Sequence, residues 1–282
     1  MSFKYKDLTI DELTIKIGAT NPFSFLHVTD SHIARWDKDK PCDRWKCFGD
    51  TPESPERYFE QAASYCRENG IVMLNTGDMI DFLSNESLKY IDKAFEGLDY
   101  IYAAGNHDFC HRVGDATENK AYKMRNLALI APHIKNNLNF DSRVINGVNF
   151  VTLDDGYYMI SDSQCEMLKF EAAKGYPIIL CVHNPFYAKK VGEITLEKGG
   201  SCALVNAPLE IIERFRDPYR RFQQEPDEAT VRACDYIMSE PLIKAIFCGH
   251  LHDAYDEVLP NGVMQYCGAA SFKGMARLVT VE

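Results

Sequence analysis

The sequence lacks any long run of apolar residues. No stretch approaches the roughly 20 residues that a membrane-spanning helix needs, and the first residues, MSFKYKDLTI, contain no apolar segment of signal-peptide length. We therefore expect a cytoplasmic protein that has no membrane partner.

Positive charge is also scarce. The chain has 31 basic and 41 acidic residues, which gives a formal net charge of −10. Such a chain repels nucleic acid over long range unless basic residues gather locally. Nucleic acid is therefore disfavoured as the main ligand.

Closely paired cysteines are missing as well. Ten cysteines are scattered through the chain without a C-x-x-C spacing, and several stand in apolar runs such as ILCVH and IFCGH. This pattern is typical of reduced, buried thiols. Cys42 and Cys47, in PCDRWKCFGD, leave open a zinc half-site or a disulfide as well as two free thiols.

What the sequence does contain is an alternation of strand and helix patterns. We expect strands that run into loops, helices with one apolar face, and hairpins at the Asn146-Gly147 and Asn261-Gly262 turn dipeptides. This order predicts an α/β fold with a mixed sheet layered by helices, or two such sheets face to face. The strands are expected within 23–30, 71–78, 99–108, 176–185 and 242–253, the helices at 55–69, 86–98 and 162–174, and the hairpins over 142–155 and 257–268.

Two stretches, 35–54 and 187–230, show no assignable pattern and no core of their own. With 282 residues, 46% of them hydrophobic, the chain can form one large domain or two modest ones. We interpret the two stretches as loop insertions in a single domain that spans residues 1–282.

Polar side chains follow five of the expected strands, in VTDSH, NTGDMID, AAGNHD, CVHNP and CGHLHD. The carboxyl ends of strands in layered α/β folds meet where sites assemble. Imidazoles, carboxylates and an amide oxygen are ligands for metals such as Zn, Mn or Fe, and their number fits two ions. The residues concerned are Asp30, His32, Asp78, Asp81, Asn106, His107, Asp108, His183, His250 and His252.

The order of these motifs, from Asp30 to His252, resembles the calcineurin-like metallophosphoesterase superfamily. The resemblance implies a four-layer α/β/β/α sandwich and two metal ions, either Mn, Fe or Zn. One ion would be held by Asp30, His32 and His252, the other by Asn106, His183 and His250, and Asp78 would bridge them.

The resemblance also implies hydrolysis of a small phosphomonoester or phosphodiester by metal-activated hydroxide. His107 would be the general acid, Asp108 would orient or charge its imidazole, and Asp81 would hold a ligand imidazole in place. The segment after Asp81, FLSNE, lacks the Arg-Gly of phosphoprotein phosphatases, and Asp81 stands where purple acid phosphatases have a tyrosine. The motifs are most similar to small bacterial-type phosphohydrolases and phosphodiesterases.

Two other functions stay open at this point. A non-catalytic scaffold of the same fold, used for protein interaction, would be expected to have lost ligands, and this chain has lost none. A serine hydrolase using Ser31 beside His32 lacks the strand-turn-helix context of a nucleophile elbow. The pattern sets neither the substrate nor the oligomeric state.

Overall fold

The structure, a computed structural model, describes residues 1–39, 42–111, 119–197, 204–214 and 224–282. Within these ranges the strands form two six-stranded sheets. The first has the order β1 (Ser2–Tyr5), β2 (Leu8–Ile15), β12 (Met275–Val281), β3 (Phe23–Val28), β4 (Val72–Asn75) and β5 (Tyr100–Tyr102). The second has the order β10 (Tyr255–Val258), β11 (Met264–Cys267), β9 (Ile243–Cys248), β8 (Ile178–Cys181), β7 (Val148–Leu153) and β6 (Phe140–Ile145).

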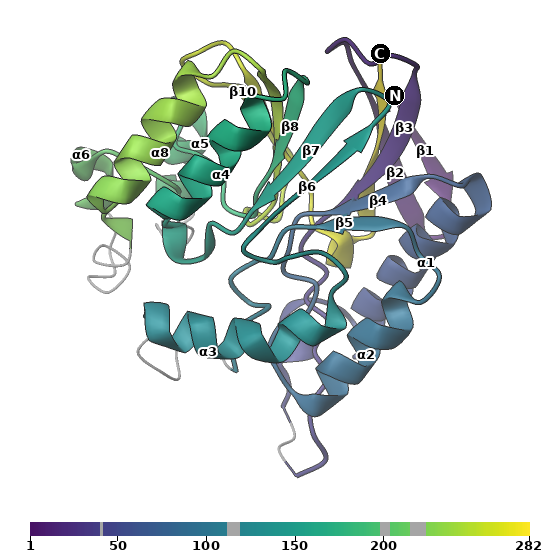
Figure 1. Ribbon diagram of the computed structural model, residues 1–282. Helices are drawn as coiled ribbons and strands as arrows, with labels where there is room; N and C mark the ends of the chain where they lie inside the picture. The colour runs from purple at the N-terminus through teal and green to yellow at the C-terminus, as the bar shows by residue number, and fades with distance from the viewer. Residues whose placement is uncertain (40–41, 112–118, 198–203, 215–223) are drawn as a thin grey trace.

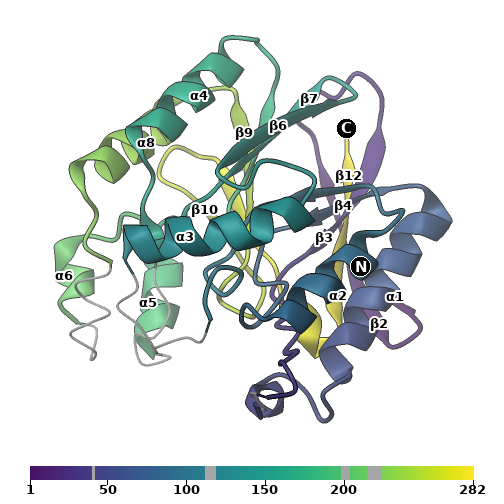
Figure 2. The same cartoon turned by 60° about the horizontal axis from the view of Figure 1, so that its bottom comes forward.

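Helices cover the outer face of each sheet (Figure 1). α1 (Ser54–Asn69) and α2 (Asn85–Phe95) lie against the first sheet, and α4 (Asp162–Ala172) and α8 (Glu228–Ser239) lie against the second. α3 (Lys120–Ile130) lies below both sheets and comes to the front in Figure 2. The predicted sandwich of two mixed sheets flanked by helices is therefore confirmed.

An apolar layer joins the inner faces of the two sheets. Phe25 of β3 packs edge-on against Phe150 of β7 and Phe247 of β9, with ring centroids 5.2 and 5.3 Å apart. Every residue of β7 is buried, because alternate side chains face the other sheet and α4. This explains why VNFVTL has no polar face. Truncating a ring such as Phe25 to alanine would cost about 3–5 kcal/mol.

Local signals explain where the predicted elements begin and end. α1 has Pro55 in its first turn and ends at Gly70, which is left-handed at φ 61°. α4 begins with a capping box between Ser161 and Gln164. β6 and β7 meet at the predicted turn, where Asn146 has a positive φ of 45°, and the second predicted hairpin is β10 with β11. These elements match the predictions to within a few residues at each end.

Several elements were not predicted. They include the β1–β2 hairpin, β12, which lies between β2 and β3, and the helices α3 and α8. Of the stretch 35–54, the described part contains one short helical turn, η1 (Arg44–Cys47). The stretch 187–230 contains α5 (Lys189–Glu197), α6 (Leu209–Ile212) and the start of α8. Residues 40–41, 198–203 and 215–223 of these stretches lie outside the described residues.

The nine cysteines in the described ranges are free thiols, and all except Cys42 and Cys47 are buried. Cys42 and Cys47 are not joined by a disulfide, and they do not belong to the described side-chain groups that could hold a metal. Across the same ranges, every helix is too short or too polar to span a bilayer.

Candidate metal centre

The five polar motifs meet at one edge of the sandwich. β3, β4 and β5 are parallel neighbours in the first sheet, and β8 and β9 are parallel neighbours in the second. Their carboxyl ends therefore deliver the following loops to a common place. Three overlapping groups of side chains there could each hold a metal ion. The first group is Asp30, His32 and His252 and the second is Asp78, His183 and His250, and each of these two combines residues that follow strands of both sheets. The third, His32, Asp78 and His107, shares a member with each of them and follows strands of the first sheet alone.

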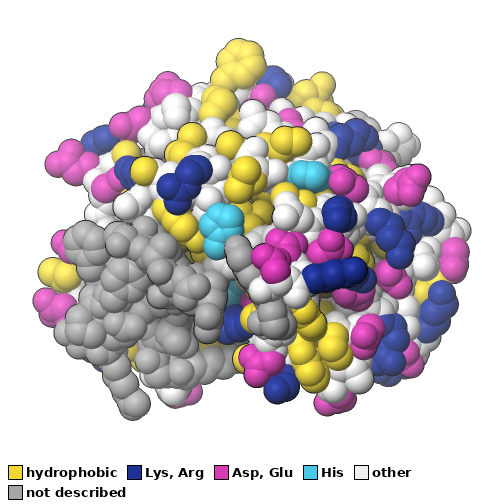
Figure 3. Space-filling view, turned by 90° about the horizontal axis from the view of Figure 1, so that it is seen from below, with side chains coloured by type: hydrophobic (Ala, Val, Ile, Leu, Met, Phe, Trp, Pro, Cys, Tyr) yellow, Lys and Arg dark blue, Asp and Glu magenta, His cyan; other side chains and the backbone are white. Residues whose placement is uncertain are grey.

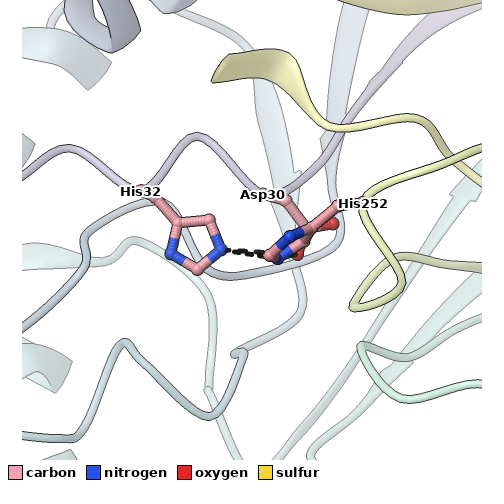
Figure 4. A group of neighbouring side chains, drawn as sticks. All are labelled: Asp30, His32 and His252. Atoms are coloured by element: carbon pink, nitrogen blue, oxygen red, sulfur yellow. Dashed lines mark hydrogen bonds and ion pairs between the residues drawn. The ribbon is translucent and has the colours of Figure 1, made fainter. Parts of the chain in front are cut away.

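In the first group, two imidazoles turn their Nε2 atoms toward each other (Figure 4). Nε2 of His32 lies 3.0 Å from Nε2 of His252, and both are near Oδ1 of Asp30, at 3.7 and 3.5 Å. The side chains of Asp30 and His32 are fully buried, whereas that of His252 is 34% exposed. Solvent therefore reaches this group from the side of His252.

Asp78 links the first group to the second. Its Oδ2 lies 3.2 Å from Nε2 of His183 and 3.6 Å from Nε2 of His32. Nδ1 of His250 lies 3.3 Å from the same Nε2 of His183. One carboxylate oxygen is thus within reach of both groups, which is the position that a bridging ligand requires.

Backbone and carboxylate acceptors set the orientation of two of these imidazoles. Nδ1 of His183 donates to the carbonyl oxygen of Thr76 at 2.7 Å, and Nδ1 of His32 donates to Oδ1 of Asp81 at 3.3 Å. With the proton of each neutral ring on Nδ1, the lone pair is on Nε2, which points into the site. Asp81 therefore lies behind the imidazole of His32, a candidate ligand.

The donor chemistry of the site fits two metal ions. Nitrogen and oxygen lone pairs converge on two points, and imidazole with carboxylate is a ligand set for Zn, Mn or Fe. Asn106, expected as a ligand of the second ion, stands between Gly105 and His107 in the loop after β5, and its Oδ1 is buried without a hydrogen-bond partner. A buried acceptor without a partner is costly, and a cation beside it would remove that cost.

The two imidazoles of each group have pKa values shifted in opposite directions. Burial disfavours the charged imidazole of His32, but hydrogen bonds with Asp30 and Asp81 outweigh it and raise its pKa to about 9. In the same way, Asp78 outweighs burial and raises the pKa of His183 to about 10. Burial lowers the pKa of His252 to about 4 and that of His250 well below its usual value. Each group thus pairs one protonated with one neutral imidazole.

The backbone of the candidate ligands is strained. A non-glycine residue with positive φ is uncommon, because its Cβ approaches the following carbonyl oxygen. Strain of this kind gathers at functional sites, where the surrounding structure imposes it. The five residues concerned are Asp30 (φ 50°), His32 (47°), Asp78 (51°), His250 (71°) and His252 (63°).

Close contacts between the loops impose this geometry. The N–H groups of Asp30 and His32 donate to the carbonyls of Gly77 and Asp78, and the N–H of His250 donates to the Asp30 carboxylate at 2.9 Å. A Cβ on Gly249 would lie 1.9 Å from Oγ1 of Thr29. Only glycine fits at that position.

The hydrogen bonds of the Asp108 carboxylate go to backbone N–H groups and not to the imidazole of His107. This fully buried carboxylate accepts backbone N–H groups of the loops after β4 and β5, at 2.8 to 3.3 Å. Asp81 lies beside His107 instead, with its Oδ1 3.0 Å from Nδ1. The structure thus places Asp81, and not the expected Asp108, in the position that orients the candidate general acid.

Two residues at the site were missed from the sequence. Asp155 follows β7, and its buried carboxylate accepts the backbone N–H groups of His183 and Asn184. Its position after a strand, in TLDDG, was a usable signal. Arg44 forms an ion pair with Asp81 and carried no signal, because it lies in an unassigned stretch. Ser31, the nucleophile of the serine-hydrolase alternative, has a buried Oγ without a hydrogen bond.

The surface below the sheets carries histidine side chains among residues of both charges (Figure 3). On the part of this face formed by described residues, acidic and basic side chains alternate, and no broad basic area is visible.

Two mixed sheets with paired histidine–carboxylate groups at their carboxyl edge define a protein with a candidate two-metal centre. The model of the calcineurin-like phosphoesterase family matches residues 23–254, so the chain belongs to this family. Members of this family depend on two metal ions.

Three solved structures are similar to this chain at low sequence identity. For a dimetal phosphatase from Danio rerio, identity is 12%, the match covers 89% of this chain and 88% of that chain, and the TM-score is 0.49. For a putative 5'-nucleotidase from Staphylococcus aureus, identity is 13%, the match covers 89% of this chain and 49% of that chain, and the TM-score is 0.45. For a phosphopantetheinyl hydrolase from Mycobacterium tuberculosis, identity is 12%, the match covers 88% of this chain and 90% of that chain, and the TM-score is 0.40. No curated protein matches the sequence.

Proposed function

We propose that the chain is a dinuclear metal-dependent phosphoesterase that hydrolyses a small phosphomonoester or phosphodiester. The observation that carries the proposal is the position of Asp78, whose Oδ2 lies 3.2 Å from His183 and 3.6 Å from His32. Family membership adds the reaction class. Asp30, His32 and His252 would hold one ion, Asn106, His183 and His250 the other, and Asp78 both.

When bound, the two ions would supply an activated water and offset charge on the phosphoryl group. The residues of the chain prepare the site for this chemistry. Asp81 and the Thr76 carbonyl keep the Nε2 lone pairs of His32 and His183 aimed inward. A substrate would enter from the side of His252 and His107, whose side chains are partly exposed.

His107 would protonate the leaving group. Its Nδ1 lies 3.0 Å from both the backbone carbonyl and Oδ1 of Asp81, so the proton on Nδ1 is shared between two acceptors. Nε2 is then the atom that can carry a proton to a departing alkoxide. Its Nδ1 is engaged by Asp81, which fixes the orientation of the ring, and 13% of the side chain is exposed to solvent.

The test is hydrolysis of p-nitrophenyl phosphate and bis-p-nitrophenyl phosphate by protein loaded with Mn, Fe or Zn. We expect turnover of at least one ester, abolished by chelation and by Asp78→Asn, which keeps the size of the side chain but removes the bridging charge. Absence of metal-dependent turnover, or full activity of Asp78→Asn, would contradict the proposal. Less than one ion per chain in the loaded protein would favour the scaffold alternative.

A second set of variants tests the role of His107. His107→Gln should keep both ions and lower turnover of alkyl phosphates by about 10²–10⁴. The loss on p-nitrophenyl phosphate should be smaller, because its leaving group needs little protonation. Equal losses on both substrates would exclude His107 as the proton donor.

A further inference from the structure

The short helical turn η1 (Arg44–Cys47) lies against the metal centre, although it belongs to a stretch that shows no sequence pattern. Arg44 holds both carboxylate oxygens of Asp81, with Nε 2.8 Å from Oδ2 and Nη2 2.9 Å from Oδ1. The Asp81 side chain is 1% exposed and that of Arg44 is 32% exposed. This is a bidentate, charge-assisted ion pair that fixes the plane of the carboxylate.

The same carboxylate serves two imidazoles of the site. Oδ1 of Asp81 lies 3.3 Å from Nδ1 of His32 and 3.0 Å from Nδ1 of His107. With Arg44, three donors therefore meet at one oxygen, which can accept them only in a narrow range of orientations. Without the guanidinium, the carboxylate is free to rotate toward one imidazole and away from the other.

Phe48, directly after η1, holds His32 from a second side. Its ring stacks on the imidazole with centroids 4.2 Å apart and planes 2° from parallel. The guanidinium carbon of Arg44 lies 5.3 Å from the centroid of the same phenyl ring. The segment from Arg44 to Phe48 thus holds the His32 imidazole in two ways. Arg44 acts on the edge of the ring through Asp81, and Phe48 stacks on its face.

We propose that Arg44 is a positioning residue that acts through Asp81 on His32 and His107. The inference rests on the proposed function, in which His32 is a metal ligand and His107 is the proton donor to the leaving group. Removal of partners that orient metal ligands typically costs about 10–100-fold in metal affinity or activity. We expect losses of that size, confined to the ion that His32 holds and to steps that use His107.

The experiment compares Arg44→Ala with Lys46→Ala. Lys46 lies on the same helical turn, carries the same charge and is 61% exposed, with Asp43 as its ion-pair partner. Stepwise metal titration by calorimetry should show one of the two binding steps weakened about 10–100-fold in Arg44→Ala and both steps unchanged in Lys46→Ala. Turnover of an alkyl phosphate should fall through kcat with KM nearly constant, whereas a residue that contacts substrate would raise KM.

Two further measurements separate positioning from charge and from folding. Arg44→Lys keeps the charge but cannot hold both oxygens, so it should recover only part of the loss, and full recovery would overturn the proposal. In metal-free protein labelled with ¹⁵N-histidine, the Nδ1–H signals of His32 and His107 should shift or broaden in Arg44→Ala and stay in place in Lys46→Ala.

The outcomes for the inference and for the proposed function are distinguishable. Wild-type protein without metal-dependent turnover contradicts the function, while the imidazole signals of the metal-free variants still test the role of Arg44. An Arg44→Ala protein that matches Lys46→Ala in its imidazole signals and in both metal-binding steps overturns the positioning role, whatever the wild-type activity.

Discussion

His32 and His252 face each other with their Nε2 atoms 3.0 Å apart. Two nitrogen lone pairs at this distance repel each other unless a proton or a cation lies between them. Because the pKa of His32 is raised and that of His252 is lowered, the protonated ring of His32 can donate to the neutral ring of His252 in the metal-free protein. A metal ion would compete with that proton for the same lone pairs, and the same holds for His183 and His250.

Only Leu251 separates His250 from His252 in the sequence, but the structure places the two histidines in different groups. We expect His252→Ala to weaken binding of the ion shared with Asp30, and His250→Ala to weaken binding of the ion shared with His183. Metal content and stepwise titration of both variants measure this. Identical loss of both ions from each variant would contradict the division into two groups.

Metal affinity should rise with pH. The pKa values of about 9 for His32 and about 10 for His183 keep both imidazoles protonated at pH 7, so that binding must release these protons. Calorimetry at pH 7 in buffers of different ionisation enthalpy should show about two protons released as both ions bind. Binding without proton release would show that these imidazoles are neutral in the metal-free protein.

The stability of the metal-free protein should change with pH in the opposite direction. A raised pKa in the folded state adds stability below the unfolded value of about 6.5. For His32 and His183 this stability is lost as pH rises through about 9 and about 10. Thermal unfolding of the chelated protein should therefore occur at lower temperature at pH 9.5 than at pH 6.5. The variant His32→Gln should show a smaller decrease.

Backbone strain at His252 predicts an unusual order of stability. His252 has φ 63°, so His252→Gly should be more stable than His252→Ala by about 1 kcal/mol in the metal-free state, although both lack the imidazole. His183 does not belong to the residues with positive φ, so there the alanine variant should be the more stable one. Urea unfolding of the four variants measures both differences, and the same order at both positions would exclude strain at His252.

Asp108 should matter for folding more than for proton transfer. Its carboxylate accepts four backbone N–H groups, and Asp108→Ala leaves them without a partner in a buried place. We expect a loss of at least about 3 kcal/mol in the free energy of unfolding, measured with urea. A variant of nearly normal stability that selectively loses turnover of alkyl phosphates would instead restore the expected role beside His107.

The strands and helices that were predicted have local signals. Apolar periodicity, the Asn146-Gly147 turn and the cap at Ser161 act over a few residues, so they can be recognised without the rest of the chain. β2 and β12 were missed because their pairing joins residues far apart in the sequence, with Thr9 opposite Met275. A strand of this kind is defined by its neighbour in space and not by its own pattern.

The site could be predicted where residue types and strand ends coincide. The gathering of Asp30, Asp78 and His183 follows from this rule. The partner of His107 could not be found in this way, because Asp108 is its neighbour in sequence whereas Asp81 approaches it from another loop. The contact between Arg44 and Asp81 also depends on loop geometry that no local pattern records.

Both groups of candidate ligands draw on the two sheets at once. Asp30 and His32 follow a strand of the first sheet and His252 follows a strand of the second, while Asp78 of the first sheet meets His183 of the second. An ion in either group would cross-link the two sheets of the sandwich. Sliding one sheet over the other would then stretch metal–ligand bonds in addition to separating apolar side chains, so the loaded protein should resist mechanical shear along that plane far better than the chelated one.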